Sequence, residues 1–371
     1  MTEIALQSLT QQVLWIAFGL SVAFGAVVQR THFCTMGAVA DVVNFGDWTR
    51  ARMWALAMGV AVIGFNGMVA VGWVEARHSL YGSTRVPWLS HAVGGLLFGV
   101  GMVLASGCGS KTLVRVGAGN LKSLVVLLVM AVSAYASLRG IVAVPRVAWI
   151  DSVVWVLPAG QDLPSLLAHA TGFPPRRGAP ILGLGLGGAM LLLALSRPQG
   201  RSPDALIGGL AVGGVVTLMW WVSGRLGHVL EHPLTLEEVF LGTPSRAMES
   251  LSFVAPVAYS LEWLMLFSDS SRVLGIGIVS VAGVVSGSAL AALAARRFRW
   301  ESFAGTEDMA LHLIGAVLMG VGGVTAMGCT IGQGLSGVST LSVGSFIATA
   351  GIVLGAWAAL RWLAWRLERS L

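Results

Sequence analysis

Two stretches of this chain align on each other: HAVGGLLFGVGMVLASGCGSKTL, residues 91–113, and HLIGAVLMGVGGVTAMGCTIGQG, residues 312–334. The alignment needs no gap and holds at one offset of 221 residues. One histidine, four glycines and one cysteine are identical in this register. Glycine by itself is common in packed membrane helices, but the shared histidine and cysteine favour an internal repeat.

The composition is that of a membrane protein. Of 371 residues, 56% are hydrophobic and 11% are charged, and the mean hydropathy is +0.80, whereas a soluble protein carries roughly a quarter charged residues. Residues 309–360 contain no Asp, Glu, Lys or Arg, and one crossing helix needs about 20 apolar residues. The predicted fold class is therefore all-α, a polytopic helical membrane protein. Apolar segments lie near 8–28, 53–74, 88–107, 123–144, 180–196, 205–224, 273–295, 309–327 and 342–364.

The basic residues lie between these apolar segments and do not form a patch with interleaved aromatic side chains. This pattern excludes nucleic acid as a partner and is typical of membrane-protein loops. We expect a single transmembrane domain over residues 1–371, with a first repeat half at 1–145 and a second at 180–371, joined by a connecting loop at 146–179. Segment 251–267 contains a proline and a glutamate, so we expect a broken or partial helix there.

Charge predicts that the two halves are inverted. The arginines at 296, 297 and 299 are expected in the cytoplasm, as are the basic residues that follow Cys108. The Cys329 segment then opens from the outside and the Cys108 segment from the inside. Inverted repeats with broken helices are a recurring plan of transporters. Glycine is a poor helix former, so we expect both Gly-Cys segments to be re-entrant turns.

The three cysteines predict the site. They are far apart in sequence and show no CxxC or CxxH spacing, which argues against zinc, iron–sulfur or a disulfide framework, so we predict no cofactor and no metal. A thiol is polarizable and a weak hydrogen-bond donor and acceptor, and helix N-termini attract anions; packing as a small hydrophobe is the alternative. We predict no catalytic residue. The candidate substrate-binding residues are Cys34, Cys108, Cys329, Gly107, Gly109, Gly328, Gly332 and Gln333.

Four further side chains have simpler explanations. Lys111 and Arg115 attract anions at an inner mouth or merely set the orientation of the chain. His91 and His312 precede their cysteines by 17 residues, which is about 25 Å along a straight helix. We therefore expect both histidines at the membrane interface.

Three motifs carry a resemblance to a known family: QRTHFCTMGA at 29–38, ASGCGSKT at 105–112 and AMGCTIGQG at 326–334. They resemble the cysteine-bearing elements of the YeeE/YedE family of bacterial inner-membrane sulfur transporters. The resemblance implies a multi-pass, hourglass-shaped transporter, not an enzyme, that takes up thiosulfate or a similar small sulfur anion. The anion would pass Cys34, Cys108 and Cys329 by weak S–H···S contacts. Implied partners are membrane lipid and a small cytoplasmic sulfur-carrier protein of the TusA-like type.

Three alternatives stay open at this point. The first is a transporter of another sulfur or selenium species. The second is a membrane-embedded sulfurtransferase or sulfur sensor that uses a cysteine persulfide. The third is a structural subunit whose cysteines only pack.

Overall fold

The computed structural model describes residues 3–233, 236–269 and 273–369. Within these ranges, nine helical stretches are long and apolar enough to cross a membrane, which confirms the predicted all-α polytopic fold. The helices of eight or more residues are α1 (Glu3–Thr31), α2 (Thr35–Phe45), α3 (Thr49–Ala70), α4 (Trp88–Leu104), α5 (Gly109–Gly117), α6 (Leu121–Arg139), α8 (Leu163–Thr171), α9 (Pro175–Leu195), α10 (Pro203–Trp221), α11 (Val254–Met265), α12 (Ile276–Ala294), α13 (Thr306–Thr325) and α14 (Val343–Glu368).

Short elements join these helices. The strands pair as two small antiparallel two-stranded sheets, β1 with β2 and β3 with β4. The short helices are η1 (Ala76–His78), α7 (Ala143–Pro145), η2 (Arg146–Ile150), η3 (Pro198–Arg201), η4 (Val222–Leu226) and η5 (Gly332–Gly337), and the strands are β1 (Arg85–Val86), β2 (Trp155–Val156), β3 (His228–Val229) and β4 (Val239–Phe240).

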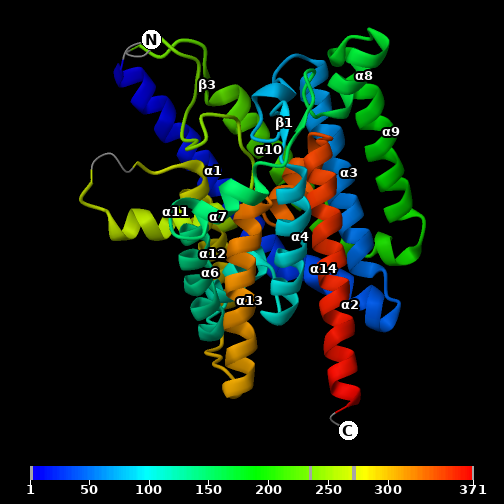
Figure 1. The fold of residues 1–371 in the computed structure, drawn as a ribbon, viewed down its shortest axis with the longest axis vertical. Helices are drawn as coiled ribbons and strands as arrows, with labels where there is room; N and C mark the ends of the chain where they lie inside the picture. The colour runs from blue at the N-terminus through cyan, green and yellow to red at the C-terminus, as the bar shows by residue number, and fades with distance from the viewer. Residues whose placement is uncertain (1–2, 234–235, 270–272, 370–371) are drawn as a thin grey trace.

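The molecule has two distinct ends (Figure 1). One end, here named the loop end, carries both two-stranded sheets, α8 and the start of α1. The opposite end, here named the basic end, carries the end of α14 and the turns that follow α5 and α12. Those two turns meet there, where the N–H of Leu121 donates to the carbonyl of Glu301 at 2.9 Å.

Glycine allows α4 and α13 to cross backbone to backbone. A Cβ built on Gly94 would lie 2.3 Å from the amide nitrogen of Ala326, and one on Gly315 would lie 2.6 Å from that of Ala105. These two contacts are equivalent, because Gly94 and Gly315 occupy the same position in the two repeats, as do Ala105 and Ala326. The helices therefore run antiparallel, and no larger residue fits at either glycine.

Two segments can be compared in detail with the sequence-based expectation. The 12-residue α11 is too short to cross a bilayer, which agrees with a partial helix at 251–267. Residues 146–179 do not form a loop throughout, because they contain η2, β2 and α8. The next spanning helix also begins earlier than residue 180, at Pro175, where proline suits the first helical position.

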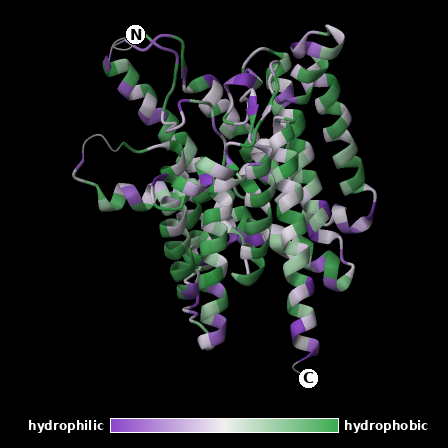
Figure 2. Cartoon of the chain, viewed as in Figure 1, coloured by the Kyte–Doolittle hydropathy of each residue, from purple (hydrophilic) through white to green (hydrophobic). Residues whose placement is uncertain are grey.

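Hydropathy follows the same axis. Figure 2 shows apolar residues along the long helices and hydrophilic residues gathered at the two ends and in the loops. Large apolar side chains point away from the protein on several spanning helices, including Leu192 on α9 and Leu290 on α12. Such surfaces suit contact with lipid tails and not with water.

Candidate functional site

Three breaks in the helical backbone share one conformation. His32, Ser106 and Met327 have φ of 54°, 55° and 58°, and each lies two residues before a cysteine. In the described ranges only seven residues other than glycine have a positive φ. A left-handed φ costs roughly 1–2 kcal/mol for such residues, so the surrounding structure must hold all three breaks in place.

Each break sets a buried thiol at the N-terminus of a helix. Cys34 and Cys108 are the N-cap residues of α2 and α5, and Cys329 precedes the helical turn that leads into η5. The sulfurs of Cys34 and Cys329 each accept the backbone N–H three residues later, at 3.3 and 3.4 Å. None of the three is more than 7% exposed, and none forms a disulfide.

The three thiols are close in space. Cys108 lies within electrostatic reach of both Cys34 and Cys329. Cys34 is also influenced by Lys111, which follows Cys108 on α5, whereas Cys329 is near Tyr81 from the loop end. Cys108 is thus the thiol that interacts with both of the others.

A fourth helix N-terminus joins the site without a cysteine. Phe253, the N-cap residue of α11, lies 3.8 Å from a Cβ built on Gly109, and its backbone contacts the Cys329 thiol. The N-termini of α2, α5, α11 and the helix after Cys329 therefore converge. Unpaired N–H groups and the helix dipoles make such a place favourable for an anion.

The candidate glycines differ in what they permit. A Cβ on Gly332 would lie 2.6 Å from the hydroxyl of Ser252, and its carbonyl accepts the Tyr81 hydroxyl at 2.7 Å. Gly332 therefore allows two polar side chains to approach the Cys329 turn. The remaining three have no neighbour nearer than 3.1 Å to a built Cβ: Gly107, Gly109 and Gly328.

Gln333 and His91 fasten the Cys329 turn. Gln333 is fully buried, and its Nε2 donates to the carbonyl of Ala326 at 2.5 Å. His91 Nδ1 lies 3.1 Å from the same carbonyl. His91 is buried and reaches this turn because the antiparallel crossing brings the start of α4 to the end of α13, a contact that the expected interfacial position did not include. In the sequence, the only feature that singled out His91 was its alignment with His312 in the repeat.

A different side chain fastens the Cys108 turn. Arg115 Nη1 donates to the carbonyl of Ser106 at 2.9 Å. Positive-inside orientation alone therefore does not account for Arg115. The two turns share their backbone shape but use different clamps, a guanidinium in one and an amide with an imidazole in the other.

The Cys329 segment is more regular than its glycine content suggests. Only residues 326–329 leave the helical conformation, and Gly332–Gly337 forms a π-helix. The predicted re-entrant turn thus consists of a short break at residues 326–329, followed by the helical residues 330–339. Packing overrides the low helix propensity of glycine here, and π-helical segments are frequent at functional sites.

Two adjoining cavities at the loop end lead toward Cys329. Their volumes are about 370 and 260 Å³, and Arg146 and Met327 line both. The second cavity reaches Gly328, next to the thiol. Arg146 is paired with Asp151 at 2.6 Å. Glu249 also lines the second cavity, and burial raises the pKa of its carboxyl above the ordinary value.

The geometry suits weak anion binding better than metal binding. Within the described ranges, no cluster of three or more His, Cys, Asp or Glu side chains is arranged to hold a metal ion. The site instead offers thiols, backbone N–H groups and converging helix N-termini. Such groups attract a small anion without the strong hold of a fixed salt bridge.

Comparison with known proteins agrees with this chemistry. The chain is 24% identical to the thiosulfate transporter TsuA of Spirochaeta thermophila over 360 residues, which cover 95% of this chain and 100% of the relative. It is 26% identical to the Escherichia coli thiosulfate transporter TsuA over 364 residues, 91% of each chain. A shorter match, 32% over 115 residues, covers 31% of the chain and 27% of the E. coli probable transporter YedE.

The family model described as sulphur transport matches residues 30–358. This range contains all three helix breaks, their cysteines and the crossing of α4 with α13. The protein therefore belongs to the sulphur transport family.

Proposed function

We propose that this protein takes up thiosulfate, or a closely similar small sulfur anion, along a path lined by Cys34, Cys108 and Cys329. One observation carries the proposal: three buried thiols each follow, by two residues, a left-handed residue at a helix break, and Cys108 interacts electrostatically with the other two thiols. Independent packing cysteines have no reason to share a strained backbone. The two long relatives, both named thiosulfate transporters, support the same substrate.

The thiols act as successive weak binding points. An anion that enters through the cavities at the loop end first meets the Cys329 turn, next Cys108 and then Cys34. Helix N-termini supply partial positive charge at each position. A thiol donates only weakly, so a sulfur anion is released as readily as it is bound. The candidate glycines and Gln333 keep the three turns in shape around this path.

The repeat halves, 1–145 and 180–371, have inverted orientation in this proposal. The reciprocal contacts of Gly94 with Ala326 and of Gly315 with Ala105 support it. The basic end then faces the cytoplasm and the loop end the outside. We place the protein in the bacterial inner membrane, where a TusA-like sulfur carrier would receive the sulfur at the basic end.

Uptake of labelled thiosulfate into vesicles that contain the purified protein tests this function. Cys34→Ala, Cys108→Ala and Cys329→Ala should each abolish saturable uptake without lowering the amount of folded protein. Ser286→Ala is a matched control, because Ser286 is half-buried on α12 and its hydroxyl donates to the carbonyl of Ala282 in the same helix. Cys→Ser variants should also fail, because oxygen lacks the polarizability of sulfur.

Two results would contradict the proposal. Normal uptake in all three Cys→Ala variants would show that the cysteines serve only in packing. A persulfide found by mass spectrometry on Cys108 or Cys329, in protein that takes up no sulfur anion, would indicate a sulfurtransferase or sensor.

A further inference from the structure

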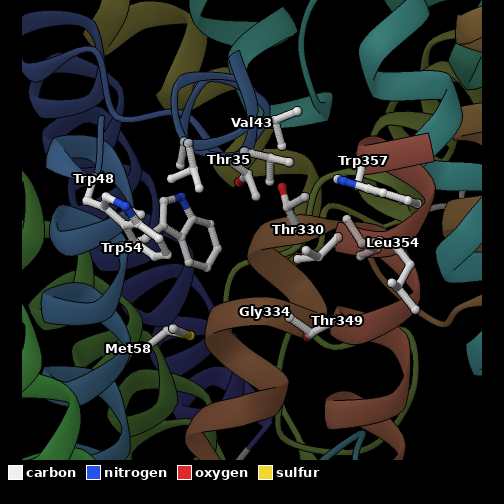
Figure 3. Close-up of a pocket in the computed structure, with 16 residues that line it drawn as sticks. Thr35, Val43, Trp48, Trp54, Met58, Thr330, Gly334, Thr349, Leu354 and Trp357 are labelled. Atoms are coloured by element: carbon white, nitrogen blue, oxygen red, sulfur yellow. The ribbon is translucent and has the colours of Figure 1, made fainter. Parts of the chain in front are cut away.

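A separate pocket lies between α2, α3, α14 and the segment that contains η5 (Figure 3). Its volume is about 590 Å³, within the range of small-molecule sites. The part of the chain that the structure describes lines it with no charged side chain, and most of the wall is Ala, Val, Ile, Leu, Met and Trp. None of Cys34, Cys108 and Cys329 lines this pocket, so it is distinct from the cysteine path.

The pocket opens toward the bilayer. Trp48, Leu354 and Trp357 form part of its wall, and they are 54%, 56% and 49% exposed on the outside of the helices. Figure 3 shows Trp48 on one side of the pocket and Leu354 with Trp357 on the other. A molecule dissolved in the membrane therefore reaches the pocket without crossing water.

The same wall contains polar atoms that lack partners. Across the described residues, ten buried side-chain polar atoms make no hydrogen bond, and four of them belong to this pocket: Thr35 Oγ1, Trp54 Nε1, Thr330 Oγ1 and Thr349 Oγ1. Thr330 is 1% and Trp54 is 7% exposed. An unpaired buried polar group costs roughly 1–3 kcal/mol. Four such atoms around one pocket therefore favour a bound molecule that forms hydrogen bonds with them.

These atoms define the chemistry of the occupant. The indole N–H only donates, and the hydroxyls of Thr35 and Thr330 stand at helix starts, where no carbonyl of the preceding turn takes their protons. A carbonyl in the pocket would meet each hydroxyl once its side chain adopts another staggered χ1 rotamer. The occupant therefore offers an acceptor oxygen, carries no charge at this depth and is otherwise apolar.

We propose that this pocket binds an acyl chain of a membrane glycerophospholipid, with an ester carbonyl directed to Thr35 and Thr330. The apolar wall holds the chain, the open side admits it from the bilayer, and the buried donors bond the carbonyl. Thr35 and Thr330 directly follow Cys34 and Cys329. The lipid thus braces α2 against α14 immediately behind two of the thiols, whichever sulfur anion is carried.

The test uses the full chain in vesicles that contain phosphatidylethanolamine with a photoreactive diazirine on its acyl chain. After illumination, peptide mass spectrometry measures adducts at Val39 and Val353 in the pocket and at Leu290, an exposed residue on α12. Adducts at both pocket positions should exceed those at Leu290. Ala51→Phe, which fills the pocket from α3, should lower them to the level of Leu290 and leave Leu290 unchanged.

A second variant separates pocket binding from misfolding. The double substitution Thr35→Val and Thr330→Val keeps the shape of both side chains and removes the carbonyl partners, so adducts at Val39 should fall in folded protein. Equal adduct yields at Val39, Val353 and Leu290 in the wild type would overturn the proposal. Displacement of the lipid by sodium thiosulfate would assign the pocket to the anion path instead, and displacement by a short-chain quinone in preference to phospholipid would assign it to a quinone; both outcomes overturn the proposal.

Discussion

Arg115 should act on transport through the shape of the Cys108 turn and not through its charge alone. Its guanidinium on α5 reaches back to the carbonyl of Ser106 at 2.9 Å. Ser106 has φ of 55°, a conformation that costs roughly 1–2 kcal/mol. The hydrogen bond therefore holds a strained residue two positions before Cys108.

The size of the effect follows from this contact. A hydrogen bond from a charged donor contributes about 1.5–3 kcal/mol, and its loss leaves the Ser106 carbonyl without that partner. If the thiol transfers the anion only from the clamped turn, each 1.4 kcal/mol lost is about a tenfold loss of rate. Arg115→Met should therefore slow uptake roughly 10- to 100-fold.

Initial rates of labelled thiosulfate uptake in vesicles, normalised to folded protein, measure this effect. Arg115→Lys keeps the positive charge but not the planar fork of donors, so it should restore only part of the rate. Arg299→Met removes one exposed positive charge from the same end and should leave the rate unchanged. Full activity of Arg115→Lys, with Arg115→Met and Arg299→Met equally impaired, would show that charge alone matters and refute the clamp.

Three further predictions concern packing, pH and the second clamp. Gly99→Leu should destabilise the protein by about 1–3 kcal/mol, because even a Cβ at Gly99 lies 2.2 Å from a carbonyl of α14; thermal unfolding checks this against Gly188→Ala, which has open space. The carboxyl of Glu249 has a raised pKa through burial, so stability should rise as pH falls from neutral toward its ordinary value of 4.5. In Glu249→Gln this contribution should vanish, and an unchanged melting-temperature profile would contradict the assignment. His91→Phe should lower uptake about tenfold by loss of roughly 1–1.5 kcal/mol at the Ala326 carbonyl, and an unaltered rate would mean that Gln333 suffices.

Hydropathy and the repeat predicted the class and plan of the fold from the sequence. A run of 52 uncharged residues admits few structures besides membrane helices, and the computed structure bears this out with nine candidate spans in its described ranges. The cysteine motifs also led to the family. Each of these inferences compares stretches of sequence with one another or with a known pattern, so none of them needs a contact in space.

Prediction was weaker where distant segments meet. Glycine content predicted re-entrant turns but not their detail: packing makes residues 330–339 helical, with a π-helix at their centre. The clamp from His91 to Ala326 joins residues 235 positions apart. No local pattern encodes such a contact, because it exists only once α4 and α13 cross in one register.

The sequence by itself determined that this chain crosses the membrane many times, that it repeats, and that three single cysteines interrupt its apolar segments. Whether a residue favours water or an apolar environment depends on its own side chain, so these properties can be read directly from the sequence. Only the tertiary structure decided that His32, Ser106 and Met327 take the same left-handed turn, and that Phe253 brings a fourth helix N-terminus to the site. A strained conformation is stable only when its neighbours hold it, and here those neighbours come from helices far apart in sequence.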